Sequence, residues 1–255
     1  MVNCWASNLG DCSDKQSVEH YTTHGLWSAG ENIISGFDWQ KGHPKMLPVQ
    51  ALQSKILCEK HNNQLSELDA EATRIFRSIG GALEAFLKWQ RQPLNKPNFP
   101  GHYDASGPLF ERWCAKTVID FVCVDKTDAS WHDTRTTLMR PPKDVVQAIY
   151  GSNQFKYPMG LYLAQENTHK SQEVLREALN VDPRYHPEGK GLVGAFLEFR
   201  SYRFLVWLTH EPFESFNTET RSGALFGNSA NAALYHPDVL AINFNITKHQ
   251  VVLKW

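Results

Sequence analysis

The stretch that decides the fold is Cys58-Glu59-Lys60-His61-Asn62, which has a counterpart in Cys4 and Cys12 near the start of the chain. Thiolate and imidazole groups are the ligands that zinc prefers, and two such pairs make a closed site of the Cys3His type. The second pair is compact, whereas the first encloses a longer turn. On spacing alone, a zinc site and cysteines that simply pack in a core explain the pattern equally well.

The residues around the two pairs favour the zinc site. Ser17-Val18-Glu19-His20 lies between the pairs, and Asn62 follows the second pair and leads into a helical pattern over residues 65–79. This order resembles the HNH, or ββα-metal, endonucleases of the zinc-knuckle type, and the resemblance covers residues 1–80. In that family one knuckle supports a hairpin that ends in an acidic residue and a histidine, and a second knuckle leads through asparagine into a helix. The resemblance places these side chains on a structural zinc ion: Cys4, Cys12, Cys58 and His61.

The resemblance also implies a catalytic site. His20 is expected to be the general base, because imidazole titrates near neutrality and can accept a proton from water. Glu19 and Asn62 are expected to bind a catalytic Mg²⁺ or Mn²⁺ ion, for which oxygen ligands are suited. Gln53 stands where the family has the asparagine that orients the histidine, and a glutamine amide can do this through one more methylene group.

Three further residues lie near the expected site in the sequence. His24 and His43 can bind phosphate or metal, although exposed loop histidines are the simpler interpretation. Asp69 follows Asn62 by two helical turns and can reach the site as another ligand, although a polar position on the helix surface is the simpler interpretation.

The composition indicates a globular chain. Of 255 residues, 42% are apolar and 21% are charged, which is not typical of disorder. Lys and Arg number 26 against 27 Asp and Glu, so phosphate contacts are expected to be local. No secretion signal or membrane-spanning run is evident, and five cysteines indicate metal binding or burial before disulfides. The sequence predicts a cytoplasmic protein whose partner is nucleic acid, DNA first, and not a membrane.

The remaining sequence predicts helices followed by strands. Apolar spacing predicts helices over 65–79, 83–89, 109–124, 143–150 and 172–179, with Gly80-Gly81 ending or weakening the first. Aromatic and β-branched residues predict strands over 192–208, with a turn near Arg200-Ser201, and a hairpin of 242–246 with 250–255. The proline-rich segment 93–100 indicates a boundary.

These patterns predict an α+β protein. Residues 1–92 are expected to form a zinc-bound ββα-metal, treble-clef-like domain, and residues 93–255 an α+β region with a helical middle and a carboxy-terminal antiparallel sheet. The expected function is metal-dependent hydrolysis of phosphodiester bonds in nucleic acid. The first alternative is an inactive zinc-bound module that recognises nucleic acid or protein, supported by Gln53 and by the balanced charge. The second is an unrelated enzyme or interaction protein that acts through the carboxy-terminal sheet.

Overall fold

The structure is a computed structural model of the 255-residue chain. It describes residues 2–27, 31–37, 40, 43–91, 102–125, 132–133, 138–166, 178–186, 188, 191–199, 202–212, 234–244 and 247–255. The helices within these ranges are η1 (Ser7–Leu9), η2 (His24–Leu26), η4 (Val49–Ala51), α1 (Glu59–Gln64), α2 (Ser66–Arg91), α3 (Gly107–Asp125) and α4 (Lys143–Ile149).

The strands fall into an amino-terminal and a carboxy-terminal group. The first group is β1 (Glu19–His20), β2 (Glu31–Ser35), β3 (Lys45–Pro48), β4 (Gln53–Ser54), β5 (His102–Ser106), β6 (His132–Asp133) and β7 (Leu138–Met139). The second is β8 (Gly160–Glu166), β9 (Ala178–Tyr185), β10 (Leu192–Phe199), β11 (Tyr202–Trp207), β12 (Leu234–Tyr235), β13 (Val239–Phe244) and β14 (Thr247–Lys254).

The amino-terminal segment contributes two separate strand pairs. β1 and β4 pair only with each other, antiparallel, with His20 opposite Gln53. β2 pairs antiparallel with β3 and parallel with β9. As a result β2 and β3 complete one end of a seven-stranded sheet whose order is β12-β8-β11-β10-β9-β2-β3.

The carboxy-terminal strands are mostly antiparallel, as predicted. β8 to β12 pair antiparallel with one another in the large sheet. β13 and β14 form an antiparallel hairpin as predicted, but β14 begins at Thr247, so Ile242 pairs with His249 and not with the predicted segment 250–255. The parallel pairing of β14 with β5 was not predicted. Parallel pairing joins segments far apart in sequence, so no local turn signal announces it.

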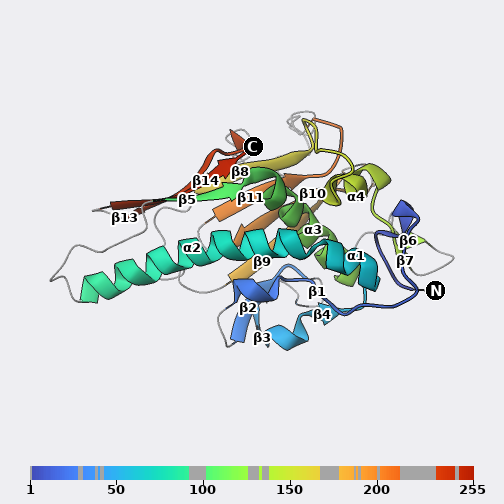
Figure 1. Cartoon of the computed structure of the whole chain (residues 1–255), viewed down its shortest axis with the longest axis horizontal. Coiled ribbons are helices and arrows are strands. Elements are labelled where there is room, and N and C mark those ends of the chain that lie inside the picture. Colours follow the sequence, from blue (N-terminus) through green and yellow to red (C-terminus); the bar gives the residue numbers. More distant parts are fainter. Residues whose placement is uncertain are drawn as a thin grey trace.

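One hydrophobic core includes residues from both sides of the predicted boundary at 92/93. α2 packs against α3, and the buried cluster extends from Trp5 through Phe76 and Trp113 to Phe199. The Phe76 ring centroid lies 5.5 Å from that of Trp113 and 4.4 Å from that of Phe199. In Figure 1, α2 crosses the length of the molecule, with β5, β13 and β14 above it and β2 to β4 below it.

The predicted break at Gly80-Gly81 is wrong, because α2 continues without interruption to Arg91. Gly80 and Ala82 are buried, and the tertiary contacts of α2 compensate for the low helix propensity of glycine. The helix predicted over 109–124 is confirmed by α3, and the short helix after Pro141-Pro142 by α4.

Residues 172–177 of the helix predicted over 172–179 lie outside the described residues. Its last two positions, Ala178 and Leu179, begin strand β9. The structure is thus a mixed α+β fold with an antiparallel-rich carboxy-terminal sheet. Within the described ranges, no helix combines the length and the apolar character needed to cross a lipid bilayer.

Gly25 allows η2 to approach α2 closely, because a Cβ atom at this position would lie 2.5 Å from Oγ1 of Thr73. We expect Gly25→Ala to lower the free energy of unfolding by about 1 to 3 kcal/mol, since the β-branched Thr73 has little freedom to move aside. Gly81→Ala is the matched control: a Cβ atom there would meet nothing within 4 Å, and alanine should stabilise α2 by roughly 1 kcal/mol. Urea unfolding measures both changes, and a Gly25→Ala protein as stable as the wild type would contradict the constraint.

Candidate functional site

Cys4, Cys12, Cys58 and His61 converge in the structure. One ligand atom from each residue lies within 4.8 Å of all the others. Nδ1 of His61 is 3.2 Å from Sγ of Cys4, 3.3 Å from Sγ of Cys58 and 3.6 Å from Sγ of Cys12. Cys12 is exposed, so burial in a core does not explain its place. The predicted convergence of the four side chains is therefore confirmed.

Backbone contacts hold the two ligand-bearing segments side by side. Gln16 forms an isolated antiparallel bridge with Cys58, and the N–H of Trp5 donates to the carbonyl of Ile56 at 3.0 Å. Cys58 is the N-cap residue of α1, and its Sγ accepts a hydrogen bond from the backbone N–H of His61. The start of α1 therefore presents both ligands of the second pair in one turn.

Asp11 fixes the orientation of the His61 ring. Its Oδ1 lies 2.9 Å from Nε2 of His61, so the proton stays on Nε2 and Nδ1 faces the three sulfur atoms. Hydrogen bonds from Lys60 and His61 lower the pKa of Asp11 and keep its carboxylate charged. On the other side, the Tyr150 hydroxyl donates to the His61 carbonyl at 3.2 Å.

The donor set is compatible with a metal ion. Three sulfur atoms and one imidazole nitrogen suit a tetrahedral ion such as zinc. Burial raises the pKa of the Cys4 and Cys12 thiols. A bound cation would favour the thiolates, because the thiolate is the form that coordinates metal.

The strand pair β1–β4 brings His20 and Gln53 together. The two residues are direct partners in the register, and their Nε2 atoms lie 2.6 Å apart. The predicted contact between them is present, and its catalytic role stays a prediction. Burial is the main cause that lowers the pKa of His20, so its imidazole is neutral near neutral pH.

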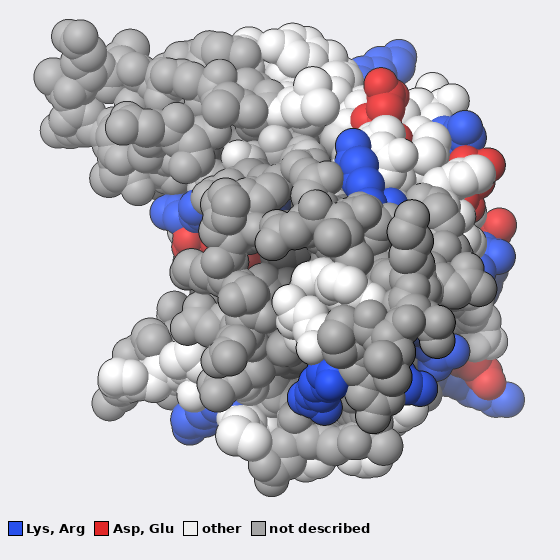
Figure 2. All heavy atoms as spheres, turned by 90° about the vertical axis from the view of Figure 1, so that its left-hand side faces the viewer, with Lys and Arg blue, Asp and Glu red and all other residues white. Residues whose placement is uncertain are grey.

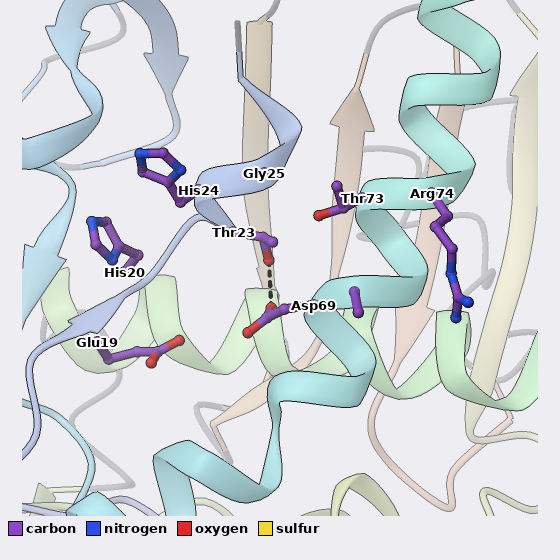
Figure 3. Close-up of a pocket in the computed structure, with 9 residues that line it drawn as sticks. Glu19, His20, Thr23, His24, Gly25, Asp69, Thr73 and Arg74 are labelled. Carbon is purple, nitrogen blue, oxygen red and sulfur yellow. Dashed lines mark hydrogen bonds between the residues drawn. The ribbon is translucent and has the colours of Figure 1, made fainter. Parts of the chain in front are cut away.

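His20 lies at an open pocket of about 480 Å³. The pocket is lined by Glu19, His20, Thr23, His24, Gly25, Asp69, Ala70, Thr73 and Arg74. Figure 3 shows His20 and His24 on the amino-terminal segment, with Asp69 and Thr73 on the facing side of α2. The His20 and His24 ring centroids are 5.6 Å apart. His43 is exposed and is not part of the lining.

Glu19 is paired with a buried lysine from α3. Its Oε1 lies 2.6 Å from Nζ of Lys116, and the two residues are only 4% and 1% exposed. The same Nζ lies 3.1 Å from Oδ1 of Asp69 and 3.5 Å from Oδ2 of Asp120. Three carboxyl groups from β1, α2 and α3 therefore surround one amine.

Burial and the neighbouring charges both shift the pKa values of Lys116 and of the carboxyl groups around it. Burial by itself lowers the pKa of Lys116, but the attraction of Asp69, Glu19 and Asp120 outweighs burial and raises the pKa above its usual value. Burial raises the pKa of Glu19 and of Asp120. The amine is therefore charged, and Glu19 and Asp120 are the members whose raised pKa favours uptake of a proton.

Asn62 does not line the pocket with His20. Its Nδ2 donates to Oγ of Ser17 at 2.7 Å, while Glu19 is held by Lys116. Within the described residues, only the Cys3His cluster gathers three or more His, Cys, Asp or Glu ligand atoms. The predicted pair Glu19 and Asn62 thus belongs to two separate hydrogen-bond systems, an arrangement that does not fit a shared Mg²⁺ or Mn²⁺ ion.

Asp69 forms part of the pocket wall. It accepts a hydrogen bond from Oγ1 of Thr23 at 2.5 Å, and this Oγ1 accepts one from Nε1 of Trp113 at 2.7 Å. Asp120, another carboxyl group beside Lys116, accepts a hydrogen bond from Nε1 of Trp5 through its Oδ1 at 2.8 Å. Because Trp5 adjoins Cys4 in the chain, these bonds connect the surroundings of the Cys3His cluster with the pocket.

Three participants were not predicted from the sequence. Lys116 and Asp120 carry opposite charges one helical turn apart among the apolar residues 113–124 of α3, and this spacing on a buried face is the signal that indicates them. Asp11 immediately precedes the ligand Cys12, and an acidic residue there is a candidate partner for a metal-binding histidine.

Removing the metal is expected to destabilise the protein, because structural zinc contributes apparent free energies of about 10 kcal/mol or more. Purified protein should contain one equivalent of zinc by elemental analysis, and a strong chelator should lower its melting temperature. Cys58→Ser should lose the metal. Cys114→Ala is the matched control, since Cys114 is buried outside the cluster and its variant should keep the metal. A metal-free wild type with the same melting curve would contradict the site.

Asp11→Asn should weaken metal affinity by roughly 10- to 100-fold, because it removes the charged acceptor that orients His61. Competition with a chromophoric chelator measures the affinity. Asp14→Asn is the control, since Asp14 is exposed and is not a member of the Cys3His cluster. Equal affinities for all three proteins would show that Asp11 does not support the ligand.

The comparisons with known proteins gave no match: no family model, no curated protein and no solved structure matches the chain. The comparisons therefore assign no family. The functional interpretation rests on three features of the molecule, which are the Cys3His cluster, the contact between His20 and Gln53, and the pocket beside them.

Proposed function

We propose that the chain is a zinc-stabilised phosphodiester hydrolase of the HNH type that cuts nucleic acid, DNA first. The observation that carries the proposal is the contact between His20 and Gln53, on a strand pair that leads directly into the ligands Cys58 and His61. This is the order of parts that the resemblance implies. Zinc at the Cys3His cluster would hold the strand pair against α1.

The proposed reaction uses His20 as the general base. The contact joins the two Nε2 atoms, and a half-turn of the Gln53 amide would bring its Oε1 to the Nε2–H group of His20. Nδ1 of His20 would then be free to take a proton from water. The hydroxide attacks the phosphorus atom, the bond to the leaving oxygen breaks, and that oxygen takes a proton from solvent. Arg74 adds positive charge at the pocket, and its guanidinium group is bonded to the buried Glu71.

The second candidate is a recognition module that has the same parts and no catalysis. The observation that favours it is the pairing of Glu19 with Lys116, which engages the expected metal ligand. On the face in Figure 2, acidic and basic side chains of the described residues are interspersed. This candidate predicts binding without cutting.

His20→Ala is the direct test of the proposed base. The variant should lose cleavage of plasmid DNA or RNA by about 100-fold or more, because it lacks the imidazole that the contact with Gln53 orients as the base. His43→Ala should retain cleavage, since His43 lies outside the pocket lining. Gln53→Leu should lose roughly tenfold, and Gln53→Glu should lose less because it keeps the acceptor.

The same assay separates the two candidates. Wild-type and variant proteins are incubated with each substrate, with and without Mg²⁺ or Mn²⁺. Equal cleavage by wild type and His20→Ala would end the assignment of the base. Nucleic-acid binding with no cleavage under any condition would support the recognition module and overturn the hydrolase.

The cleavage rate should rise with pH and then level off. The base must be neutral to accept a proton, and burial lowers the pKa of His20 from its usual value of 6.5. Protonation therefore removes activity only below that value, and the rate should be constant between about pH 7 and 8. A rate that continues to rise above pH 8 would indicate a different base.

A further inference from the structure

The Lys116 amine lies among the carboxyl groups that line or support the pocket. Its Nζ is 2.6 Å from Glu19, 3.1 Å from Asp69 and 3.5 Å from Asp120. These residues come from β1, α2 and α3, so the amine occupies the point where three elements meet. Glu19 and Asp69 also line the pocket that contains His20, so this charge lies directly behind the pocket wall.

The number of carboxyl groups around the Lys116 amine equals the number of N–H donors that the amine has. An ammonium group has three N–H donors and no acceptor, and three carboxyl groups surround it. Asp69 gives its other contact to Thr23, and Asp120 gives its other contact to Trp5. Lys116 is 1% exposed. Glu19 and Asp69 are its nearer partners, whereas Oδ2 of Asp120 lies 3.5 Å from the amine and makes no hydrogen bond with the described residues.

A divalent ion at the same carboxylates would conflict with this arrangement. Mg²⁺ requires oxygen ligands at about 2.1 Å in near-octahedral geometry. An ion that close to Glu19 and Asp69 would stand next to the ammonium group, and two like charges in a buried setting repel strongly. The ion and the lysine therefore compete for the same oxygens.

We infer that the Lys116 ammonium group takes the place of a divalent cation at this pocket, so that the native chain binds neither Mg²⁺ nor Mn²⁺ there. Lys116 is a positioning residue, because it is buried and acts through Glu19 and Asp69. The inference that this pocket binds no Mg²⁺ or Mn²⁺ does not depend on the proposed function. Its consequence, that cleavage needs no added divalent ion, rests on the proposed function.

The chemistry of the cluster gives the inference a second consequence. Lys116→Met keeps much of the buried volume and removes the positive charge. The three carboxyl groups then face one another without a cation between them. In the native chain the ligand oxygens of Glu19, Asp69 and Asp120 do not all lie within 4.8 Å of one another. Without the amine between them, an Mn²⁺ ion would draw them together as its ligands. The variant should therefore gain a divalent site that the native protein lacks.

The test uses the full chain with zinc in the Cys3His cluster. Mn²⁺ is titrated into the wild type while the imidazole NMR signals of His20 and His24 are followed, with His43 as the internal control. Paramagnetic broadening reports an ion at the pocket. We expect no broadening specific to His20 and His24 in the wild type, because Lys116 holds the carboxylates.

The variants give the matched comparison. Lys116→Met should bind Mn²⁺ at least roughly tenfold more tightly than the wild type, and Asp69→Asn in the same protein should remove the gain. Lys88→Met, which removes an exposed lysine from α2, should leave Mn²⁺ binding unchanged. Circular dichroism establishes that each variant is folded.

Two results would overturn the inference: broadening confined to His20 and His24 in the wild type at micromolar Mn²⁺, or a folded Lys116→Met protein with wild-type Mn²⁺ binding. If Lys116→Met does not fold, the wild-type titration decides alone. Cleavage distinguishes the two proposals. Strong stimulation of cleavage by Mg²⁺ would support the hydrolase and overturn the inference. A wild type that shows no Mn²⁺ broadening of His20 and His24 and no cleavage would support the inference and overturn the hydrolase.

Discussion

The convergence of Cys4, Cys12, Cys58 and His61 is the constraint on which the amino-terminal half depends. It joins two segments that are far apart in the chain, and the free energy of binding a cation there would add to the free energy of folding, because the unfolded chain rarely forms such a site. The segment between them contains β1 and β4, so closing the loop fixes the strand pair that carries His20 and Gln53. α1 begins at Cys58, so the same contact sets the start of the helical region.

The buried cluster around Lys116 is the second constraint, and it connects α3 with this half of the molecule. Burying Glu19, Asp120 and the Lys116 amine, with Asp69 half-buried beside them, has a high desolvation cost, which only close pairing offsets. Removing one partner would leave a charge without compensation, so the cluster requires α2, α3 and β1 to keep their relative positions. Such a group contributes less to net stability than apolar packing does, and it favours one arrangement of the elements over others.

Local signals account for what the sequence predicts well. Ligand spacing identifies Cys58 and His61, apolar periodicity identifies α3, and alternation identifies the β13–β14 hairpin. The errors arise where distant contacts decide. Gly80-Gly81 resembles a helix end, yet tertiary packing continues α2 through it. The pairing of Lys116 with Glu19 and the hydrogen bond of Asn62 to Ser17 both depend on the folded chain, so a family pattern read along the sequence assigned Glu19 and Asn62 to one ion.

The position of β2 between β9 and β3 has a consequence for how the chain can be divided. A fragment that stops after α2 would leave one edge of β2 without its parallel neighbour, and an unpaired strand edge invites association with other chains. The same fragment would lack α3 and with it the amine beneath Glu19 and Asp69. The histidine pocket is therefore a property of the entire chain, and it cannot be transplanted as a self-sufficient cassette.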